Sequence, residues 1–482
     1  MDNNFAKKLY DPGTFREQGH QMVNLLADYL EKVSQQKDGI PVTQWKFPNQ
    51  QLTYWQEALQ NPKLNLPDFF QQVLDQSIHL HHPKYIGHQV SPVAPLAALT
   101  SLVSSFLNNG MAVYEMGATA TAMERLVIQE LSKVLGFDEQ ADGFLTSGGT
   151  LATLTALLAA RQKVSQGNIW EKGLRQKLAV MVSEEAHYCI DRACRIMGFG
   201  AEGVIKIPVN AQFQMDTSLL EEYYQQAQAN GFEVIAIVGS ACSTSTGSYD
   251  NLEAIGRFCQ GKPLWFHIDG AHGGAVAYSS RYASLLKGVT QADSIIIDYH
   301  KMLLTPALAT AVVFREGKDS YSAFAQKAQY LYEQDEQEWH ELGKRTFECT
   351  KYMMGFKVYT LLRTYGPELF EANIDYLYQL TQRFARLIES RQDLELALRP
   401  QANIICFRYT SAKKSTEELN TINRNLRRQL LEKGEFYIVQ TQLKGLVYLR
   451  ATLMNPLTTE LELTQLLDTI GKLLKAEMLS TK

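Results

Sequence analysis

Several residues whose side chains could carry chemistry stand directly after apolar runs. Lys301 ends the stretch SIIIDYHK, Asp269 ends LWFHID, and His187 follows LAVMVSEEA. Thr244 lies in ACSTSTG, and the glycine-rich stretch TSGGT covers residues 146–150. A charged group at the end of a buried strand is costly, so it is usually paired, neutralised or used covalently. These residues are therefore candidates for one shared site.

Each of these side chains has a different chemical use. The amine of Lys301 could form a Schiff base with an aldehyde, and we expect burial to lower the pKa of this amine so that it can attack. Asp269 could pair with a protonated pyridine nitrogen, and His187 could stack on a ring. The TSGGT loop could hold a phosphate at the start of a helix. Together they form the set that a pyridoxal 5′-phosphate enzyme requires.

Each motif also has an ordinary structural interpretation. Two glycines before a helix often form only a tight turn, and Thr150 could be a helix N-cap. Asp269 could cap the next turn, His187 could be a hydrogen-bonded structural histidine, and Lys301 could be solvated. The order and the context of the motifs favour the cofactor site over these alternatives.

Composition limits the class of protein. Among 482 residues, 45% are hydrophobic and 20% charged, and the net charge of −4 gives no reason to expect nucleic acid or an anionic membrane as a partner. The start MDNNFAKKLYDPGTF lacks a signal-peptide core, and no segment approaches the ~20 apolar residues of a membrane span. The six cysteines form no C-x-x-C pair. We therefore expect reduced thiols, a cytoplasmic location and no metal site.

Short apolar strands alternate with helical patterns over the middle of the chain. The predicted strands cover residues 143–146, 178–183, 204–209, 234–239, 264–268, 294–297 and 308–314. Helical patterns cover 150–162, 185–197 and 251–259, so His187 should lie early in a helix. This alternation predicts an α/β fold with a mainly parallel sheet covered on both faces. Ligands bind at the carboxyl ends of such strands, where the candidate residues would meet.

The two ends of the chain differ from this middle part. Residues 1–95 are mostly helical in pattern and too polar to form a core of their own, so we expect this arm to pack on a partner subunit. Residues 96–370 would form the large α/β domain. Residues 371–482, with strands predicted at 404–409 and 446–452, would form a small α+β domain.

The chain resembles the group II pyridoxal-phosphate-dependent amino acid decarboxylases, which include glutamate, aromatic amino acid, cysteine sulfinate and diaminobutyrate enzymes. The motifs that carry the resemblance extend over nearly the whole chain in the family's order. They are F-R-x-x-G-x-x-M-V, HPKYIGH, TSGGT, AHYC, the Ser/Thr run before Gly247, HIDGAHGG, DYHK, AQYLYEQD and LRATLMNP. The resemblance implies an aspartate aminotransferase-like fold (fold type I) and a homodimer with its active site at or near the subunit interface.

The resemblance also implies roles for individual residues. Lys301 would be the Schiff-base lysine, Asp269 would bind the ring nitrogen and stabilise negative charge developing at Cα, and Ala271 would lie on the ring face opposite His187. The remaining cofactor-binding residues would be Ser147, Gly148, Gly149, Thr150, Thr244, Asp298 and His300. Tyr330 would protonate the substrate Cα after carbon dioxide leaves. Substrate contacts would come from Ser91, His88 and Arg450, the last of which anchors a carboxylate in glutamate-type members.

Two positions depart from the family pattern. Asp298-Tyr299 stands where many members have Asn-Pro, which would alter hydrogen bonding to the cofactor, and Gly270 replaces a common alanine. Tyr330 is retained, and in the family its replacement by phenylalanine diverts the reaction to oxidative aldehyde formation.

The predicted activity is decarboxylation of a glutamate-like, diamino or aromatic L-amino acid to its amine, through the Lys301 Schiff base and a quinonoid intermediate. The alternatives are an aminotransferase or another carbon–carbon lyase of the same fold, and a non-catalytic binding protein. A dinucleotide-binding oxidoreductase is disfavoured because no G-x-G-x-x-G follows an early strand.

Overall fold

The computed structural model describes residues 3–60, 65–165, 169–324 and 339–480. The chain divides into two compact units. The larger unit comprises Gln89–Ala385 and Leu398–Cys406, and the smaller unit comprises Met1–His88, Arg386–Ala397 and Phe407–Lys482. The three-part division at residues 95 and 370 remains a prediction. In the described part of the chain, no helix combines the length and the apolar character needed to cross a membrane.

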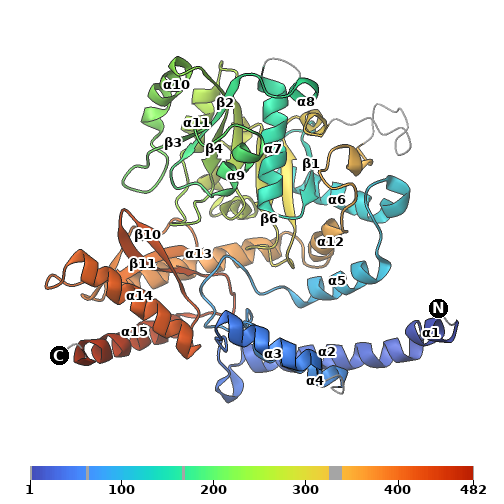
Figure 1. Cartoon of the computed structure of the whole chain (residues 1–482), viewed down its shortest axis with the longest axis vertical. Helices are drawn as coiled ribbons and strands as arrows, with labels where there is room; N and C mark the ends of the chain where they lie inside the picture. Colours follow the sequence, from blue (N-terminus) through green and yellow to red (C-terminus); the bar gives the residue numbers. More distant parts are fainter. Residues whose placement is uncertain (1–2, 61–64, 166–168, 325–338, 481–482) are drawn as a thin grey trace. The chain divides into compact units, whose positions relative to one another are not determined.

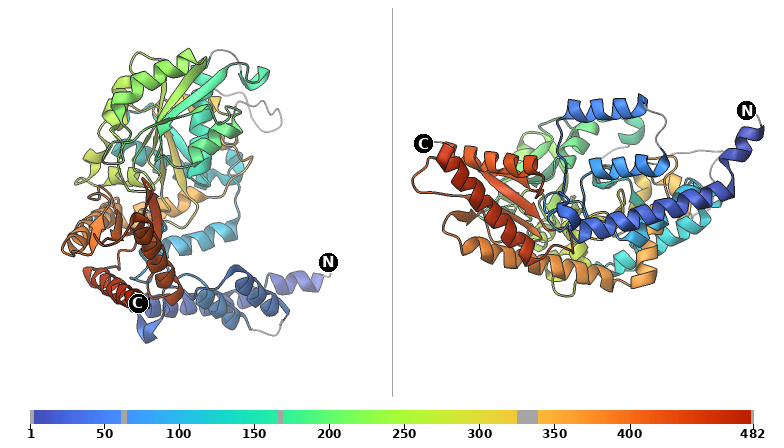
Figure 2. Two further views of the ribbon diagram at one scale, coloured as in Figure 1. Left: turned by 60° about the vertical axis from the view of Figure 1, so that its left-hand side comes forward. Right: turned by 90° about the horizontal axis from the view of Figure 1, so that it is seen from below.

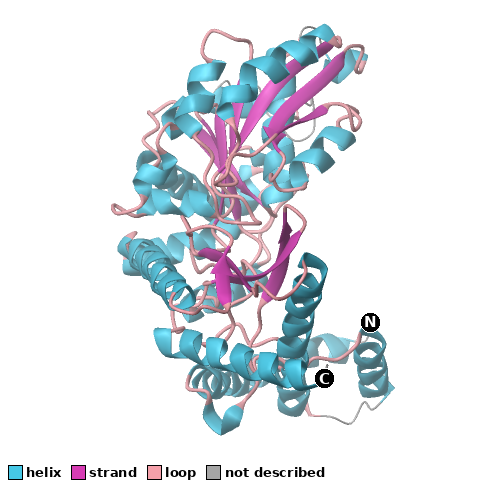
Figure 3. Cartoon of the chain, turned by 90° about the vertical axis from the view of Figure 1, so that its left-hand side faces the viewer, coloured by secondary structure: helices cyan, strands magenta, loops and turns pink. Residues whose placement is uncertain are grey.

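A seven-stranded sheet organises the larger unit, with the strand order β1-β7-β6-β5-β4-β2-β3. Strands are magenta in Figure 3. Only β7 runs antiparallel to its neighbours among these strands. The strands are β1 (Asp142–Thr146), β2 (Lys177–Ser183), β3 (Val204–Ile207), β4 (Phe232–Ser240), β5 (Trp265–Asp269), β6 (Ser294–Asp298) and β7 (Thr310–Phe314). The predicted, mainly parallel α/β fold is confirmed.

Helices cover both faces of this sheet, and its strands are therefore buried on both sides. Trp265 belongs to the apolar cluster that α7 (Gly149–Val164) forms on one face. On the other face, α11 (Leu252–Cys259) packs closely on Gly239 of β4. A Cβ atom added to this glycine would lie 2.9 Å from Leu252 and 3.4 Å from Phe266. Both helices are labelled in Figure 1. The other helices that begin in this unit are α5 (Pro95–Leu107), α6 (Tyr114–Val134), α8 (Ile169–Lys172), α9 (Cys189–Ile196), α10 (Leu220–Ala229), α12 (Met354–Tyr365) and α13 (Glu368–Glu389).

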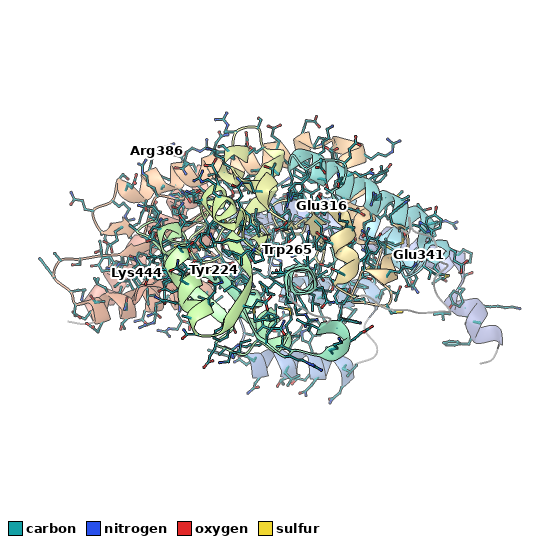
Figure 4. All side chains as sticks on the ribbon, turned by 90° about the horizontal axis from the view of Figure 1, so that it is seen from above. Tyr224, Trp265, Glu316, Glu341, Arg386 and Lys444 are labelled. Carbon is teal, nitrogen blue, oxygen red and sulfur yellow. The ribbon has the colours of Figure 1, made fainter. Side chains whose placement is uncertain are left out.

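Strand alternation directs two carboxylates to the α7 face of the sheet. The indole N–H of Trp265, labelled in Figure 4, donates to Ser294 Oγ at 2.8 Å, and His267 Nδ1 lies 2.8 Å from the same oxygen. Side chains two residues apart share a face, so Asp269 follows Trp265 and His267, while Asp298 follows Ser294. Both aspartates are the last residues of neighbouring parallel strands. The carboxyl edge of the sheet therefore carries both acids.

One row of residues links the start of α7 to β6. Thr310 of β7 stands opposite Thr146, the last residue of β1, and opposite Asp298, the last residue of β6. The Thr146 hydroxyl donates to the Thr310 carbonyl oxygen at 3.4 Å, and the Thr310 hydroxyl donates to Asp298 Oδ1. The glycine-rich turn after β1 and the lysine segment after β6 are thereby fixed at the same edge of the sheet.

The smaller unit contains the terminal helices and, apart from residues 404–406, a four-stranded sheet. Its helices are α1 (Asn3–Leu9), α2 (Pro12–Ser34), α3 (Pro48–Gln60), α4 (Leu66–Gln76), α14 (Thr416–Lys433) and α15 (Glu460–Ser480). The sheet order is β10-β11-β9-β8, with β8 (Leu394–Leu396), β9 (Ile404–Tyr409), β10 (Val439–Leu443) and β11 (Leu446–Thr452). Helix α2 begins where Asp11 accepts a hydrogen bond from the Thr14 N–H at 2.7 Å, and it packs on α4, which is also blue in Figure 2.

Candidate active site

A cavity of about 180 Å³ opens at the carboxyl edge of the seven-stranded sheet. It is lined by Gly149, Thr150, His187, Cys189, Cys242, Thr244, Asp269, Ala271, His272, Ile296, Asp298, His300 and Lys301. Most of these residues follow the ends of β1, β2, β4, β5 or β6, which is where ligands bind in parallel sheets. The cavity thus brings most of the predicted cofactor-binding residues together.

Lys301 is held by the acid that ends β6. Its Nζ lies 2.9 Å from Asp298 Oδ2, and His300 Nε2 lies 3.6 Å from the same oxygen. Burial alone would raise the pKa of Asp298, but the nearby Lys301 and His300 charges together lower it. The pKa of Lys301 is raised, because the effect of burial is outweighed by Asp298 and Asp269. The prediction that burial lowers the pKa of Lys301 is therefore wrong for the chain without a ligand.

Asp269 is a buried carboxylate whose loss of hydration is only partly offset by nearby charges and hydrogen bonds. Its side chain accepts a hydrogen bond from the Ala271 N–H at 3.2 Å, and the residue is only 8% exposed. Burial raises the pKa of Asp269, and the neighbouring His187 and Lys301 only partly offset this effect. A carboxylate in this state gains stability from any cation that enters the cavity.

His187 and Cys189 lie beside Asp269. Their ligand atoms and a carboxylate oxygen of Asp269 all lie within 4.8 Å of one another. Burial lowers the pKa of His187, which favours the neutral imidazole. Burial also raises the pKa of the Cys189 thiol well above its usual range, which opposes the thiolate that a metal would need. The trio therefore favours ring binding over metal binding.

His187 differs from prediction in its local structure. The expected helix from residue 185 begins only at Cys189, and His187 lies in the preceding turn. Its Nδ1 accepts a hydrogen bond from the Cys189 N–H at 3.3 Å. This bond fixes the imidazole at the N-terminal side of α9 and leaves the ring on the cavity wall.

The start of α7 forms another wall of the cavity. Gly148 stands at the N-cap position with φ of 134°, a conformation that side chains rarely allow, and it provides no side-chain cap. Thr150 lies inside the first turn and is not the N-cap. The first N–H groups of a helix have no partner within the helix, so an uncapped start can bind an anion. A Cβ atom at Gly149 would lie 3.6 Å from Asp298 Oδ1, which places this turn beside the lysine segment.

Other predicted residues lie elsewhere. Ser147 and Gly148 precede the cavity residues Gly149 and Thr150, and the Ser147 hydroxyl donates to Glu348 at 2.8 Å. Ser91, in the larger unit, is buried, and its hydroxyl has no hydrogen-bond partner among the described residues.

The remaining predicted substrate residues belong to the smaller unit or are not described. Arg450 is buried on β11 of the smaller unit. His88 belongs to the same unit. Burial, followed by the charges of Arg450 and Arg427, lowers the pKa of His88. Tyr330 lies outside the described residues.

Four cavity residues were not predicted: Cys189, Cys242, His272 and Ile296. His272 Nε2 lies 2.7 Å from Asn403 Oδ1, which anchors the turn that follows β5. The sequence did contain a signal for all four, because each stands within three residues of a predicted site residue. Their types alone were uninformative, since buried thiols and histidines are usually structural.

Comparisons with known proteins agree with this arrangement. A family model described as "Pyridoxal-dependent decarboxylase conserved domain" matches residues 47–410. The chain is 25% identical to an aromatic-L-amino-acid decarboxylase of Bacillus atrophaeus over 95% of both chains. It is 28% identical to an L-2,4-diaminobutyrate decarboxylase of Acinetobacter baumannii, covering 80% of this chain and 79% of the relative. A solved glutamate decarboxylase domain from Vibrio parahaemolyticus matches with a TM-score of 0.83, 26% identity and 95% coverage of both chains.

Proposed function

Because the chain belongs to the pyridoxal-dependent decarboxylase family, we propose that it converts an L-amino acid to the corresponding amine and carbon dioxide in the cavity around Lys301. The protein is accordingly an amino acid carboxy-lyase that depends on pyridoxal 5′-phosphate. The observation that carries the proposal is the placement of Lys301 and Asp269 on the walls of one cavity that also contains the start of α7.

The residues present fit the cofactor group by group. The uncapped start of α7, with Ser147 through Thr150, would hold the phosphate. Asp269, whose pKa burial raises, would gain a cationic partner from a protonated ring nitrogen. His187 and Ala271 would lie against the ring, and Lys301 would bind the aldehyde carbon. Thr244, Asp298 and His300 would complete the contacts.

When bound, the cofactor supplies an electron sink for the electrons that remain on Cα after the carboxyl group leaves. The protein's own contribution begins with a proton at Lys301. Its amine is protonated beside Asp298, so attack on an aldehyde requires the proton to leave Nζ. Asp298 Oδ2, at 2.9 Å, is the acceptor within hydrogen-bonding distance, and His300 Nε2 lies 3.6 Å beyond that oxygen. We assign this pair as the proton acceptor for the lysine.

Asp269 would act electrostatically. Its fixed negative charge in a water-poor site favours the protonated ring and thereby the transfer of electrons away from Cα, and preorganised charge of this kind is usually the largest contribution to catalysis. Tyr330 would then return a proton to Cα.

For the substrate, we propose a glutamate-like, diamino or aromatic L-amino acid. The relatives named above act on aromatic and diamino acids by their names, and the family resemblance assigns Arg450 to a second substrate carboxylate. Carbon dioxide release should be measured from the standard amino acids together with diaminobutyrate, ornithine and cysteine sulfinate. Activity with one class and none with the others would identify the side chain that the site accepts.

The reaction type has its own test. Purified protein with added cofactor should absorb visible light, and borohydride should attach the cofactor to Lys301. The variant Lys301→Ala should lose both properties and the activity. Visible absorbance that persists in Lys301→Ala, or keto acid formed in place of carbon dioxide by the native protein, would overturn the assignment.

We further propose that the protein acts as a homodimer with the active site at or near the subunit interface. Helix α5 supports this proposal because it presents large apolar side chains to solvent, among them Leu102 and Phe106, the latter 69% exposed. Exposed apolar patches of this kind mark protein contacts.

A further inference from the structure

We propose that three buried charged residues, Glu124, Arg345 and Lys351, are positioning residues for the cofactor phosphate. They bind the free edge of β1 and thereby fix the turn from β1 to α7. The inference rests on the proposed function, because the phosphate is assigned to that turn.

The first observation concerns the edge of the sheet. β1 is the outermost strand, so one of its edges has no neighbouring strand. On that edge the Leu145 N–H donates to Glu124 Oε1 at 3.0 Å, and Lys351 Nζ donates to the Leu145 carbonyl oxygen at 2.7 Å. Two residues earlier, Arg345 Nη2 donates to the Gly143 carbonyl oxygen at 3.1 Å. Charged side chains here replace the hydrogen bonds that an eighth strand would make.

The second observation is that these charges neutralise one another away from water. Lys351 pairs with Glu124, and each side chain is only 2% exposed. Arg345, with a side chain 1% exposed, pairs with Asp142 at 2.7 Å. The Arg345 and Lys351 cations lie 5.4 Å and 5.6 Å from the centre of the Phe144 ring. Both cations are thus held over the middle residue of β1.

The third observation is that stability does not explain this arrangement. A buried ion pair usually contributes no more to folding than well-packed apolar residues would, because both charges lose their hydration. Glu124 Oε2 and Arg345 Nε are moreover buried without a hydrogen-bond partner among the described residues. A costly and directional cluster is better explained by a need for accurate placement of the backbone it binds.

That backbone leads directly into the proposed phosphate site. Leu145 is followed by Thr146, whose hydroxyl donates to the Gly148 carbonyl oxygen at 3.2 Å. The segment that supplies Arg345 and Lys351 also supplies Glu348, which accepts a hydrogen bond from Ser147 at 2.8 Å. One short segment therefore contacts β1 and its turn at three points.

The opposite edge of β1 allows little adjustment. A Cβ atom at Gly143 would lie 2.0 Å from the Val312 carbonyl oxygen of β7, so β1 lies unusually close to its neighbour. The end of β1 is thus held from both sides. Removal of the charged side chains would let the turn from β1 to α7 move. Small displacements of a binding group reduce binding strongly.

The test compares pyridoxal 5′-phosphate with pyridoxal, which lacks the phosphate. The dissociation constant of pyridoxal divided by that of pyridoxal 5′-phosphate measures what the phosphate site contributes to binding. We expect the double variant Glu124→Leu/Lys351→Met to lower this ratio by about tenfold or more, because only the binding of pyridoxal 5′-phosphate should weaken. Its cofactor-free form should unfold close to the native temperature.

The conservative variant Lys351→Arg keeps a cation and its donors, so it should retain most of the ratio, and it provides the comparison if the double variant does not fold. Arg408→Met is the matched control, because it removes a buried cation paired with Glu395 in the smaller unit. It should leave the ratio unchanged.

An unchanged ratio in the double variant, or an equal fall in Arg408→Met, would overturn the inference. Failure of the proposed function would look different, because the native protein would then bind neither aldehyde at Lys301.

Discussion

Lys301 Nζ and Asp298 Oδ2 lie 2.9 Å apart, three residues from each other at the end of β6. The contact helps to keep the amine charged in the absence of a ligand, because Asp298 and Asp269 together outweigh the effect of burial on the pKa of Lys301. The lysine is thus held in its charged, unreactive form beside an ionised carboxylate.

The first prediction follows from this pair. In Asp298→Asn the pKa of Lys301 should fall, because burial then acts against the charged amine with only the smaller effects of Asp269 and Cys242 to oppose it. The midpoint pH for attachment of the cofactor aldehyde, measured as the fraction trapped by borohydride, should fall by roughly one unit or more. Asp319→Asn, which removes a carboxylate paired with Lys163, is the control and should not move the midpoint. A midpoint that stays in place or rises in Asp298→Asn would contradict the prediction.

The second prediction concerns Asp269. Burial raises its pKa above the usual 3.8 in the folded chain. A carboxyl group of this kind favours folding only while it is protonated, so its contribution is present below 3.8 and is lost as the pH rises through the folded value. Cofactor-free Asp269→Asn should therefore unfold at a higher temperature than the native chain at pH 7, by a few degrees, and the difference should shrink as the pH falls towards 4.

The same variant should lose activity. Without the carboxylate, the ring nitrogen has no anionic partner, and kcat should fall at least about a hundredfold. Thermal unfolding and carbon dioxide release from one preparation check both effects. A variant that is less stable without cofactor, or that keeps its activity, would show that Asp269 has another role.

A third prediction concerns Tyr330, which lies outside the described residues and remains an assignment from the family resemblance. Tyr330→Phe should suppress amine formation while visible absorbance of the bound cofactor persists, because only the proton donor to Cα is lost. Amine and aldehyde should be quantified together. A native yield of amine would remove Tyr330 from the mechanism.

The fourth prediction tests the dimer. In Phe106→Asp a charge replaces a large exposed apolar side chain on α5, and burial of that charge in an interface would be costly. Light scattering should show a lower proportion of dimer and a dependence on concentration. Gln225→Asp, on the exposed face of α10, is the matched control. A native protein that is monomeric, or a Phe106→Asp dimer as strong as the native one, would exclude α5 from the interface.

The sequence predicted most strands of the two sheets well, because these strands are short apolar runs bounded by polar or glycine residues. β9 and β11 match their predicted bounds, and β6 differs only by including Asp298. The strands β8 and β10 were not predicted. β8 has three residues, and β10 reads VQTQL, in which exposed polar residues interrupt the apolar pattern.

The site was predicted to the extent that its residues follow strands. Chain order alone places Lys301, Asp269 and His187 at one edge of a parallel sheet. The pKa of Lys301 was predicted in the wrong direction, because it depends on the rotation of Asp298 and Asp269 towards the amine. The cluster of Glu124 with Lys351 was also not recognised, since these residues are 227 positions apart in the sequence.

The row formed by Thr146, Thr310 and Asp298 has a consequence for how the chain can change. The turn that starts α7 and the segment that carries Lys301 are both positioned by the same threonine, the first residue of the antiparallel strand β7. A deletion or insertion of a single residue in β7 would turn that hydroxyl to the opposite side and disconnect both halves of the catalytic apparatus at once. We would therefore expect β7 to tolerate altered length less than any surface loop, although it lines none of the cavity.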